Sequence, residues 1–488
     1  MGNWGTGKLK QGKPCFSKGW FLGLAALLSG GVLSSCSNRP VSPGLVPTTE
    51  LGTLRGQNFV RAITHFHTPY SFDACDGKGY NADGTINHAC WADARYAFCE
   101  NHINYIFATD HVNHLTETSF ADLALLESGD TALASGGGTI GNRIHCPNGF
   151  APTLAIGLEG KLLALGMENH VSADLTDRQN VYDGEDPTRL RGTGVNDAKA
   201  LVGVPHTESR DLITLTAIQP SFVEIYNVHA NLDPKIRKKY LGRNPFDKIG
   251  VFINYLADPY SSLNPDYMFL DFIEFNEVYF QRWDALVSAS PTARVTGVGG
   301  LDSHENIFSQ KGADGERLDH HRRMTRFINN LVLTSTDSIA GVKAAIEAGR
   351  VFFTVEGMGT PVGLDYHGVR TSAGVDTVFE MGEIMSVTAP ATARLEFTLP
   401  SVHPSFPGMD SDERPEIRAE LIQVSSSGTE TVVARTFSSQ LVYSNPGLGD
   451  YRIHVYQKPR HLRELLFDED LADQEFLWMV SNHIKVTN

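Results

Sequence analysis

Histidine and carboxylate residues follow short, mostly apolar runs at five places in this sequence. Each run spans three to five residues, and the runs with the residues behind them are Phe59–Ile63 with His65, His67 and Asp73; Tyr105–Ala108 with Asp110 and His111; Leu154–Ile156 with Glu159 and His170; Leu201–Val204 with His206; and Val295–Val298 with Asp302 and His304. Imidazole nitrogens and carboxylate oxygens together suit zinc, manganese or iron. Gathered in space without a cation, they would be unsatisfied or repel one another. The pattern therefore indicates metal chemistry.

The runs must be the elements that bring these side chains together. Their length and composition are typical of buried parallel strands. When such strands alternate with helices around a barrel, the residues behind their carboxyl ends meet at one mouth. A single histidine behind a strand is more often a hydrogen-bonded residue, and Asp302 with His304 also fits a helix N-cap and its neighbour. Five coincidences in chain order favour a metal site over these separate explanations.

At these positions the sequence resembles the PHP (polymerase and histidinol phosphatase) family of metal-dependent hydrolases. Four stretches are each similar to one family motif: HFHTPYSFD at His65–Asp73, TDH at Thr109–His111, GLE at Gly157–Glu159, and GGLDSH at Gly299–His304. The remaining motif departs from the family pattern, because Thr207 stands where proline is expected behind His206. His170 would supply the histidine that follows the third motif, in surroundings that also depart from the pattern. The resemblance covers residues 55–356.

The resemblance implies two or three divalent ions per chain, zinc, manganese or iron, in a trinuclear arrangement. Carried over position by position, it assigns His65, His67, Glu159 and Asp302 to one ion, Glu159, His170 and His206 to a second, and Asp73, His111 and His304 to a third. A water activated by such ions becomes a nucleophile near neutral pH. Glu159, as the bridge between two ions, and Asp302 are the residues that hydrolysis should need most. Asp110 would orient His111 or assist proton transfer.

A phosphate substrate would also require a cationic anchor. Arg322, Arg323 and Arg326 follow the last motif at helical spacing, and Arg323 is the expected anchor. The alternative is a basic helix face in contact with solvent. Three functions remain open: a phosphoesterase, which the resemblance favours; a hydrolase of the same fold that acts on a carboxylic or carbamic ester; and a non-catalytic metal-binding lipoprotein. The expected partner of either enzyme is a small-molecule ester.

The N-terminal segment is interpreted as a targeting signal. Four lysines precede the apolar stretch Trp20–Val32, which is shorter than the roughly 20 residues of a membrane-spanning helix. The stretch ends in Leu-Ser-Ser-Cys at Cys36, which resembles a bacterial lipobox whose cysteine carries lipid. Residues 1–35 are then the signal peptide and residues 36–54 a tether, with the outer membrane of the cell envelope as the expected location. A simple membrane anchor, or a secretory signal cut elsewhere, is the alternative.

Charge and cysteine content narrow the partners and the compartment. The net charge is −15, with no basic stripe, which argues against nucleic acid; the membrane is contacted through the lipid alone. Four cysteines remain behind Cys36: Cys75, Cys90, Cys99 and Cys146. An even number in an exported protein favours disulfides, with three possible connectivities. Thiolate zinc binding is the alternative, but a Cys75–Cys90 bridge is preferred, and it would stiffen the segment behind Asp73.

The remaining pattern predicts an α/β protein in two parts. Residues 55–356 alternate strand-like and helix-like segments, and the resemblance implies a distorted (β/α)7-type PHP barrel there. A helix is expected at Ala92–Glu100, another at Ser338–Ala348, and a closing strand at Val351–Val355. Long insertions at 172–199 and 231–266 would form the specificity loops at the mouth.

From residue 358 the sequence changes to short alternating strands separated by Gly, Ser and Pro turns. The expected strands are Ala393–Leu399, Ile417–Val424, Thr431–Thr436 and Tyr451–Val455. This pattern predicts a small all-β, sandwich-like domain over residues 358–488. It holds no dense group of ligand-type residues, so we expect an accessory module.

Overall fold

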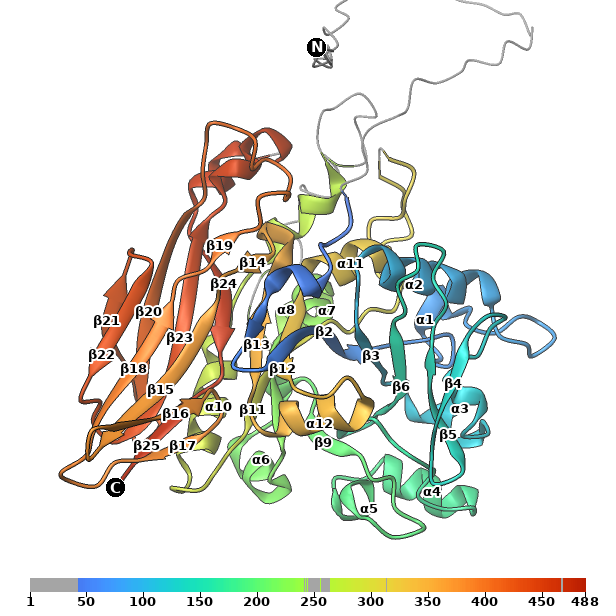
Figure 1. Ribbon diagram of the computed structural model, residues 1–488. Helices are drawn as coiled ribbons and strands as arrows, with labels where there is room; N and C mark the ends of the chain where they lie inside the picture. The colour runs from blue at the N-terminus through green and yellow to red at the C-terminus, as the bar shows by residue number, and fades with distance from the viewer. Residues whose placement is uncertain are drawn as a thin grey trace, which may run out of the picture. The chain divides into compact units, whose positions relative to one another are not determined.

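The computed structural model describes residues 43–488, apart from 241, 243, 245–254, 256–263, 313 and 467. These residues belong to one compact unit with a mixed α/β architecture and one large sheet (Figure 1). The predicted signal peptide and the lipidation at Cys36 lie outside the described residues, as do parts of the tether and of the 231–266 insertion. Within the described part of the chain, no helix is long and apolar enough to cross a membrane.

The large sheet contains the strands predicted from the first three apolar runs. Its order runs β17-β25-β23-β24-β13-β12-β2-β3-β6-β5-β4. The strands that precede residue 358 in the chain are β1 (Thr53–Leu54), β2 (Gln57–Phe66), β3 (Tyr105–Ala108), β4 (Thr131–Ser135), β5 (Gly138–Arg143), β6 (Thr153–Ile156), β12 (Asn329–Thr334) and β13 (Val351–Thr354). As predicted for buried strands, β2, β3 and β6 are parallel, and β3 and β6 are buried throughout. The predicted closing strand, β13, pairs with β12 in the antiparallel sense.

The other two apolar runs lie in a second sheet. Its strands, in the order β11-β10-β9-β8-β7, are β7 (Leu158–Glu159), β8 (Leu163–Leu165), β9 (Leu201–Val204), β10 (Phe222–Asn227) and β11 (Thr296–Gly300), and β9, β10 and β11 are parallel. Two isolated β-bridges join the two sheets near the carboxyl ends of their strands. One pairs Phe66 with Ser303, and the other pairs His111 with Glu159. The carboxyl ends of β2, β3, β9 and β11 therefore face a common region.

Helices cover the two sheets, and their ends follow the capping residues of the sequence. They are α1 (Ala74–Gly77), α2 (His88–Glu100), α3 (Val112–Glu117), α4 (Leu175–Tyr182), α5 (Thr188–Arg191), α6 (Leu212–Ile218), α7 (Val228–Leu232), α8 (Pro234–Tyr240), α10 (Glu277–Ser288), α11 (His321–Phe327) and α12 (Ile339–Glu347). Helix α12 begins behind Ser338, whose side chain accepts a hydrogen bond from the Gly341 N–H, and Gly349 follows its end at a φ of 76°. The predicted helices at 92–100 and 338–348 are thus confirmed.

Two disulfides hold the first part of the chain. Cys75 pairs with Cys90, which confirms the preferred bridge, and Cys99 pairs with Cys146. The first bridge joins α1 to α2 directly behind the turn that carries Asp73. The second joins the end of α2 to the loop in front of β6. Both therefore fix helix α2 to segments that lead into the predicted ligands.

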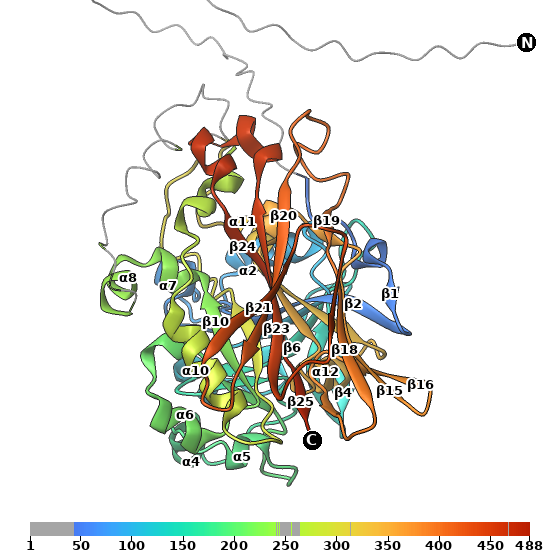
Figure 2. The ribbon, with the colours of Figure 1, turned by 90° about the vertical axis from the view of Figure 1, so that its left-hand side faces the viewer.

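The C-terminal part is built from strands, which face the viewer in Figure 2. They are β14 (Pro361–Val362), β15 (Asp365–Ser372), β16 (Val375–Glu380), β17 (Ile384–Ser386), β18 (Thr392–Thr398), β19 (Ser401–Val402), β20 (Glu416–Val424), β21 (Glu430–Thr436), β22 (Gln440–Ser444), β23 (Gly449–Lys458), β24 (Phe476–Ser481) and β25 (Ile484–Thr487). One four-stranded sheet has the order β16-β15-β18-β22. Because β24 pairs with β13, the large sheet continues into this part through β17, β20, β21, β23, β24 and β25, whereas β14 and β19 form a two-stranded sheet of their own.

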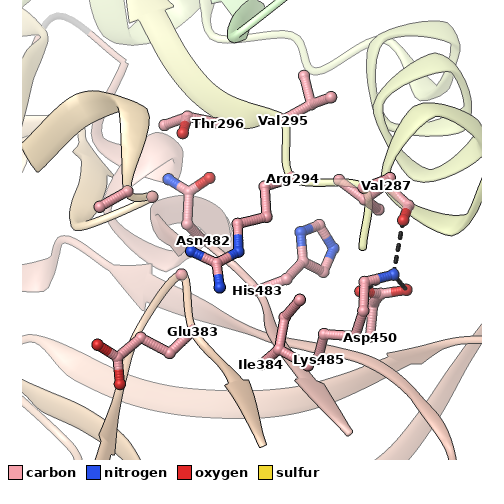
Figure 3. A pocket seen from close by; sticks show the side chains of 14 residues that line it. Val287, Arg294, Val295, Thr296, Glu383, Ile384, Asp450, Asn482, His483 and Lys485 are labelled. Carbon is pink, nitrogen blue, oxygen red and sulfur yellow. Dashed lines mark hydrogen bonds and ion pairs between the residues drawn. The ribbon is translucent and has the colours of Figure 1, made fainter. Parts of the chain in front are cut away.

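Polar side chains join the C-terminal strands to the first part of the chain. The Asn482 side-chain amide accepts a hydrogen bond from the Gly297 N–H and donates to the carbonyl oxygens of Gly297 and Val351. The Lys485 ammonium donates to the Val287 carbonyl near the end of α10, at 2.7 Å, and pairs with Asp450. Figure 3 shows Val287, Asp450, Asn482 and Lys485 among the residues around a cavity of about 20 Å³, which has room for a single water. This junction is polar but closely packed.

Candidate metal centre

Four side chains from three strand ends point their ligand atoms at one spot. His65 and His67 stand at the end of β2, Glu159 in β7, and Asp302 behind β11. The His65 Nε2 lies 3.1 Å from the His67 Nε2, 3.4 Å from the Glu159 Oε2 and 3.3 Å from the Asp302 Oδ1. The His67 Nε2 lies 3.3 Å and 3.2 Å from the same two oxygens. All four residues are buried.

These separations have the size expected around a small cation. For ligands about 2.0–2.2 Å from a tetrahedral ion, neighbouring ligand atoms lie roughly 3.3–3.6 Å apart. The oxygens Glu159 Oε2 and Asp302 Oδ1 are buried and have no hydrogen-bond partner, although each lies within 3.4 Å of three imidazole nitrogens. Buried polar atoms are normally satisfied. The donor set therefore fits a bound divalent ion.

Two further groups of ligand atoms adjoin the first. The Asp73 Oδ2 lies 3.5 Å from the Nε2 of both His111 and His304. On the other side, the His206 Nε2 lies 3.4 Å from Glu159 Oε1 and 3.4 Å from Asp302 Oδ2. Glu159 thus directs one oxygen to each of two groups, and so does Asp302. We call His65, His67, Asp73, His111, Glu159, His206, Asp302 and His304 together the metal centre.

Polar groups behind the two β2 histidines fix the direction of their rings. Glu224 of β10 accepts a hydrogen bond from the His65 Nδ1 at 2.6 Å. The Ser71 hydroxyl lies 2.7 Å from the His67 Nδ1 and donates to Asp110 at 3.1 Å. With Nδ1 donating outward, each Nε2 presents its lone pair to the metal centre. Both rings therefore have the tautomer that a metal ligand needs.

Asp110 acts through a different neighbour from the one expected. Its carboxylate accepts from the Thr68 N–H and hydroxyl, both at 2.7 Å, and from Ser71. The Ser71 hydroxyl in turn accepts from the His111 backbone N–H at 3.0 Å. Asp110 is buried, and burial raises its pKa. It therefore holds the turn behind β2 and positions His67 through Ser71, rather than the His111 ring.

The turns behind the strands use unusual backbone conformations. His206 and Asp302 have φ values of 48° and 54°, in the left-handed region that costs a non-glycine residue about 1 kcal/mol or more. A Cβ at Gly300 would lie 2.0 Å from the Glu224 Oε1. Glycine at this position therefore lets the carboxylate approach β11 and reach His65.

The electrostatic field of the site favours positive charge among the ligands. Burial opposes the ionisation of Glu159 and Asp302, but the facing imidazoles, His65 foremost, outweigh it and hold the pKa of both carboxyls well below the usual range. Burial also opposes protonation of His67, yet Asp302 and Glu159 raise its pKa to about 9. Burial and the neighbouring His67 lower the pKa of His304. A divalent cation supplies the charge that these carboxylates otherwise draw from protons.

His170 lies apart from the metal centre. Its Nδ1 lies 2.9 Å from the Tyr182 hydroxyl, and its Nε2 lies 2.9 Å from the Thr118 carbonyl oxygen. Burial lowers its pKa to about 4, so the ring is neutral. Because both ring nitrogens are engaged with α4 and the end of α3, the structure does not bring His170 to the second group with His206.

The three arginines behind the last motif are buried, so they do not form the solvated helix face that was the alternative to a phosphate anchor. The Asp266 carboxylate bonds Arg322 with both oxygens, at 3.0 and 2.7 Å, and also bonds Arg323. Asp314 and Glu316 complete the pairing of Arg323. Arg323 therefore makes no contact with the metal centre and does not act there as an anchor. We call Arg322, Arg323, Arg326, Asp266, Asp314 and Glu316 the arginine cluster.

Two residues at the site were missed by the sequence reasoning. Glu224 lies in the run Phe222–Asn227, and a lone carboxylate inside such a buried run was the available signal. His229, in α7, places its Nδ1 3.2 Å from the Asp302 carbonyl oxygen and its ring 5.0 Å from that of His304. Its ligand atoms group with those of Asp302 and His304. No motif in the sequence pointed to it.

No family model matches this sequence, and no curated protein matches it. A crystal structure of a two-domain protein from Bacteroides vulgatus, which contains a predicted PHP-like metal-dependent phosphoesterase, is similar to this chain. The two share 9% sequence identity with a TM-score of 0.32, over 85% of this chain and 94% of that one.

Proposed function

We propose that this protein is a metal-dependent hydrolase of the PHP type, and that it cleaves phosphate esters at the metal centre. The observation that carries the proposal is the set of buried ligand atoms 3.1–3.4 Å apart around Glu159 Oε2 and Asp302 Oδ1. Such a set has no structural use without a cation, since its carboxylate oxygens are otherwise unsatisfied. The proposed fold is a PHP barrel over residues 55–356 with an accessory β domain over residues 358–488.

Bound divalent ions would supply an activated water and would neutralise the oxygens of a phosphoryl group. The residues of the chain would hold these ions and orient their ligands. His65, His67, Glu159 and Asp302 would hold one ion, Asp73, His111 and His304 another, and His206 a third position shared with Glu159 and Asp302. Glu224 and Ser71 orient two of the imidazoles. Glu159 and Asp302 each offer an oxygen to two positions, which fixes the spacing between them.

The first experiment measures metal content and activity in the chain from residue 37 onward. We expect two or three zinc, manganese or iron ions per chain, and hydrolysis of phosphate monoesters or diesters. The double variant His65→Ala/His67→Ala should lose most of the metal and keep its fold, because the site lies behind the strands. His88→Ala is the matched control, since that ring is exposed and pairs only with Glu127.

Different outcomes separate the proposal from its alternatives. Bound metal with cleavage of carboxylic or carbamic esters alone would favour a different hydrolase on the same centre. Bound metal without any ester cleavage would favour a metal-binding lipoprotein. Absence of metal after reconstitution with all three ions would overturn the metal centre itself.

We also propose that the protein is anchored to the bacterial cell envelope by lipid on Cys36. The support is the lysine-rich and apolar segment in front of Leu-Ser-Ser-Cys. Metabolic labelling with a fatty acid should mark the wild-type chain, and Cys36→Ser should release it from the membrane fraction. A Cys36→Ser chain that is processed and still sediments with membranes would contradict the lipid anchor. Cys15→Ser is the matched control, since that residue precedes the apolar stretch.

A further inference from the structure

Phe72 exposes a large apolar ring beside the metal centre. Its side chain stands between two functional neighbours in the chain, Ser71 and Asp73, and 53% of it is exposed. The ring centroid lies 5.2 Å from that of His111, at an interplanar angle of 33°. Phe72 therefore lies within reach of any molecule that is bound at His111.

Phe72 adjoins one exposed side of the metal centre; His206, on the other side, is also 26% exposed. The side chains of His111 and Asp73 are 26% and 31% exposed, whereas those of His65 and His67 are fully buried. A substrate must reach the ligands from solvent, and His111 and Asp73 are among those that solvent already touches. Phe72 is exposed beside these two ligands, in ring contact with His111.

The backbone around Phe72 is held on both sides. In front of it, the Ser71 N–H donates to the Thr68 carbonyl, and Ser71 is completely buried. Behind it, the Cys75 N–H donates to the His304 carbonyl at 2.8 Å, and the bridge to Cys90 fixes the same residue to α2. The ring is thus presented from a fixed turn. A preorganised aromatic surface loses little entropy when a ligand packs on it.

An exposed phenylalanine is not by itself evidence of binding, because single apolar side chains are common on protein surfaces. Phe437, between β21 and β22, is 68% exposed and illustrates the ordinary case. What distinguishes Phe72 is its ring contact with His111 and its place between a residue that orients His67 and a residue of the metal centre. The two phenylalanines therefore form a matched pair for experiment.

The charged residues near the site also point to apolar recognition. Among the described residues, no lysine or arginine makes a hydrogen bond or an ion pair with a member of the metal centre. The expected anchor, Arg323, is engaged with Asp266 and Asp314. Within the described residues, the charged part of an ester has only the metal centre to bind.

We propose that Phe72 binds a planar, apolar group of the substrate, so that the preferred substrates are aryl esters rather than short alkyl esters. The inference rests on the proposed phosphoesterase function and adds a substrate class to it. The Phe72 ring packs on the planar group by an offset or edge-to-face contact, as aromatic pairs do. The contact excludes water from the exposed face of the ring.

The test compares the binding of phenylphosphonate and methylphosphonate to the metal-loaded protein by calorimetry. Neither compound can be hydrolysed, so the comparison does not depend on leaving-group chemistry. We expect phenylphosphonate to bind the wild type about tenfold more tightly or better. Phe72→Ala should bring the ratio close to one, and Phe72→Tyr should keep it, because the tyrosine retains the ring. Phe437→Ala is the control and should leave the ratio unchanged.

The outcomes distinguish this inference from the function on which it rests. A ratio near one in the wild type, or a ratio that survives Phe72→Ala, would overturn the role of Phe72 and leave the phosphoesterase proposal intact. Failure of both phosphonates to bind a fully metallated protein would overturn both. Metal content is measured in each variant, because a Phe72→Ala protein with full metal and a reduced ratio can owe the reduction only to the lost ring.

Discussion

The metal centre and the arginine cluster both bury many ionisable side chains, but they differ in the kinds of groups that face one another. In the arginine cluster, guanidinium groups meet carboxylates, as where Asp266 bonds Arg322 with both oxygens. In the metal centre, lone-pair atoms meet one another, as where the Nε2 atoms of His65 and His67 lie 3.1 Å apart. The first region is neutralised from within the chain. The second requires a positive charge that its own side chains do not bring.

Arg326 differs from the other two arginines of the arginine cluster in how its charge is balanced. Arg326 is buried, its three guanidinium nitrogens make no hydrogen bond, and its nearest carboxylate oxygen, on Asp266, is 3.9 Å away. It lies instead between the rings of Tyr267 and Phe406, at 5.4 and 5.3 Å. The faces of aromatic rings attract a cation. The charge of Arg326 is therefore also balanced within the chain.

The largest effect should follow from breaking the metal centre at Glu159. Glu159→Gln removes the charge that two groups of ligands share, so ions at both positions should bind more weakly and lie farther apart. We expect the rate of ester hydrolysis to fall roughly a thousandfold or more, with fewer ions per chain. Steady-state kinetics and elemental analysis measure both. Glu168→Gln, at a partly exposed carboxylate paired with Lys199, is the control; near wild-type activity in Glu159→Gln would reject the mechanism.

The arginine cluster should respond in the opposite way. Asp266→Asn leaves the buried Arg322 and Arg323 guanidinium groups short of charge, which costs about 3–5 kcal/mol for a broken buried pair. Its metal content and kcat should stay close to wild type wherever the protein is folded. Urea unfolding of metal-free chains gives the contrast. The imidazoles that face Glu159 can lose their protons when its charge is removed, whereas a guanidinium group cannot, so Glu159→Gln should cost less than Asp266→Asn. Equal losses of stability in the two variants would remove the distinction between the regions.

The third effect concerns the support behind the ligands. Glu224→Gln keeps a group of similar size but removes the carboxylate that accepts from His65. Loss of such a partner commonly weakens metal binding by about 10–100-fold. Competition with a chelator would measure the affinity. Glu208→Gln, whose carboxylate lies 3.3 Å from the His206 Nδ1, tests whether the support extends to a second ligand; an unchanged affinity in Glu224→Gln would make that contact structural only.

The sequence was sufficient to place the strands behind which the ligands stand. The runs at 105–108 and 201–204 have the same bounds as β3 and β9, and the other three runs lie within or overlap β2, β6 and β11. Apolar content and length determine a buried strand locally, so this level of structure can be read from short windows. The Cys75–Cys90 bridge followed in the same way from a short segment.

Residues whose partners lie far along the chain could not be placed in this way. Arg323 was expected to anchor a phosphate, but it pairs with Asp266, which lies 57 positions earlier in the chain. His170 follows the third motif in sequence, but its Nδ1 is hydrogen-bonded to the hydroxyl of Tyr182 in α4, within the acidic insertion. How an insertion folds back depends on contacts that no local pattern contains. His229 was missed for the same reason.

The smallest effect should be the acid dependence of the arginine cluster. Burial opposes ionisation of Asp266, but Arg323 and Arg322 outweigh it and hold its pKa well below the usual range. Because the native pKa is lower than the unfolded value of about 3.9, the carboxylate contributes stability that is complete above that value. The contribution is lost as the pH falls toward the native pKa. The wild-type free energy of unfolding should therefore drop as the pH is lowered from about 5, and the drop should be smaller in Asp266→Asn, which has no proton to take up there. Parallel pH profiles in the two proteins would show that Asp266 is no better stabilised when folded than when unfolded.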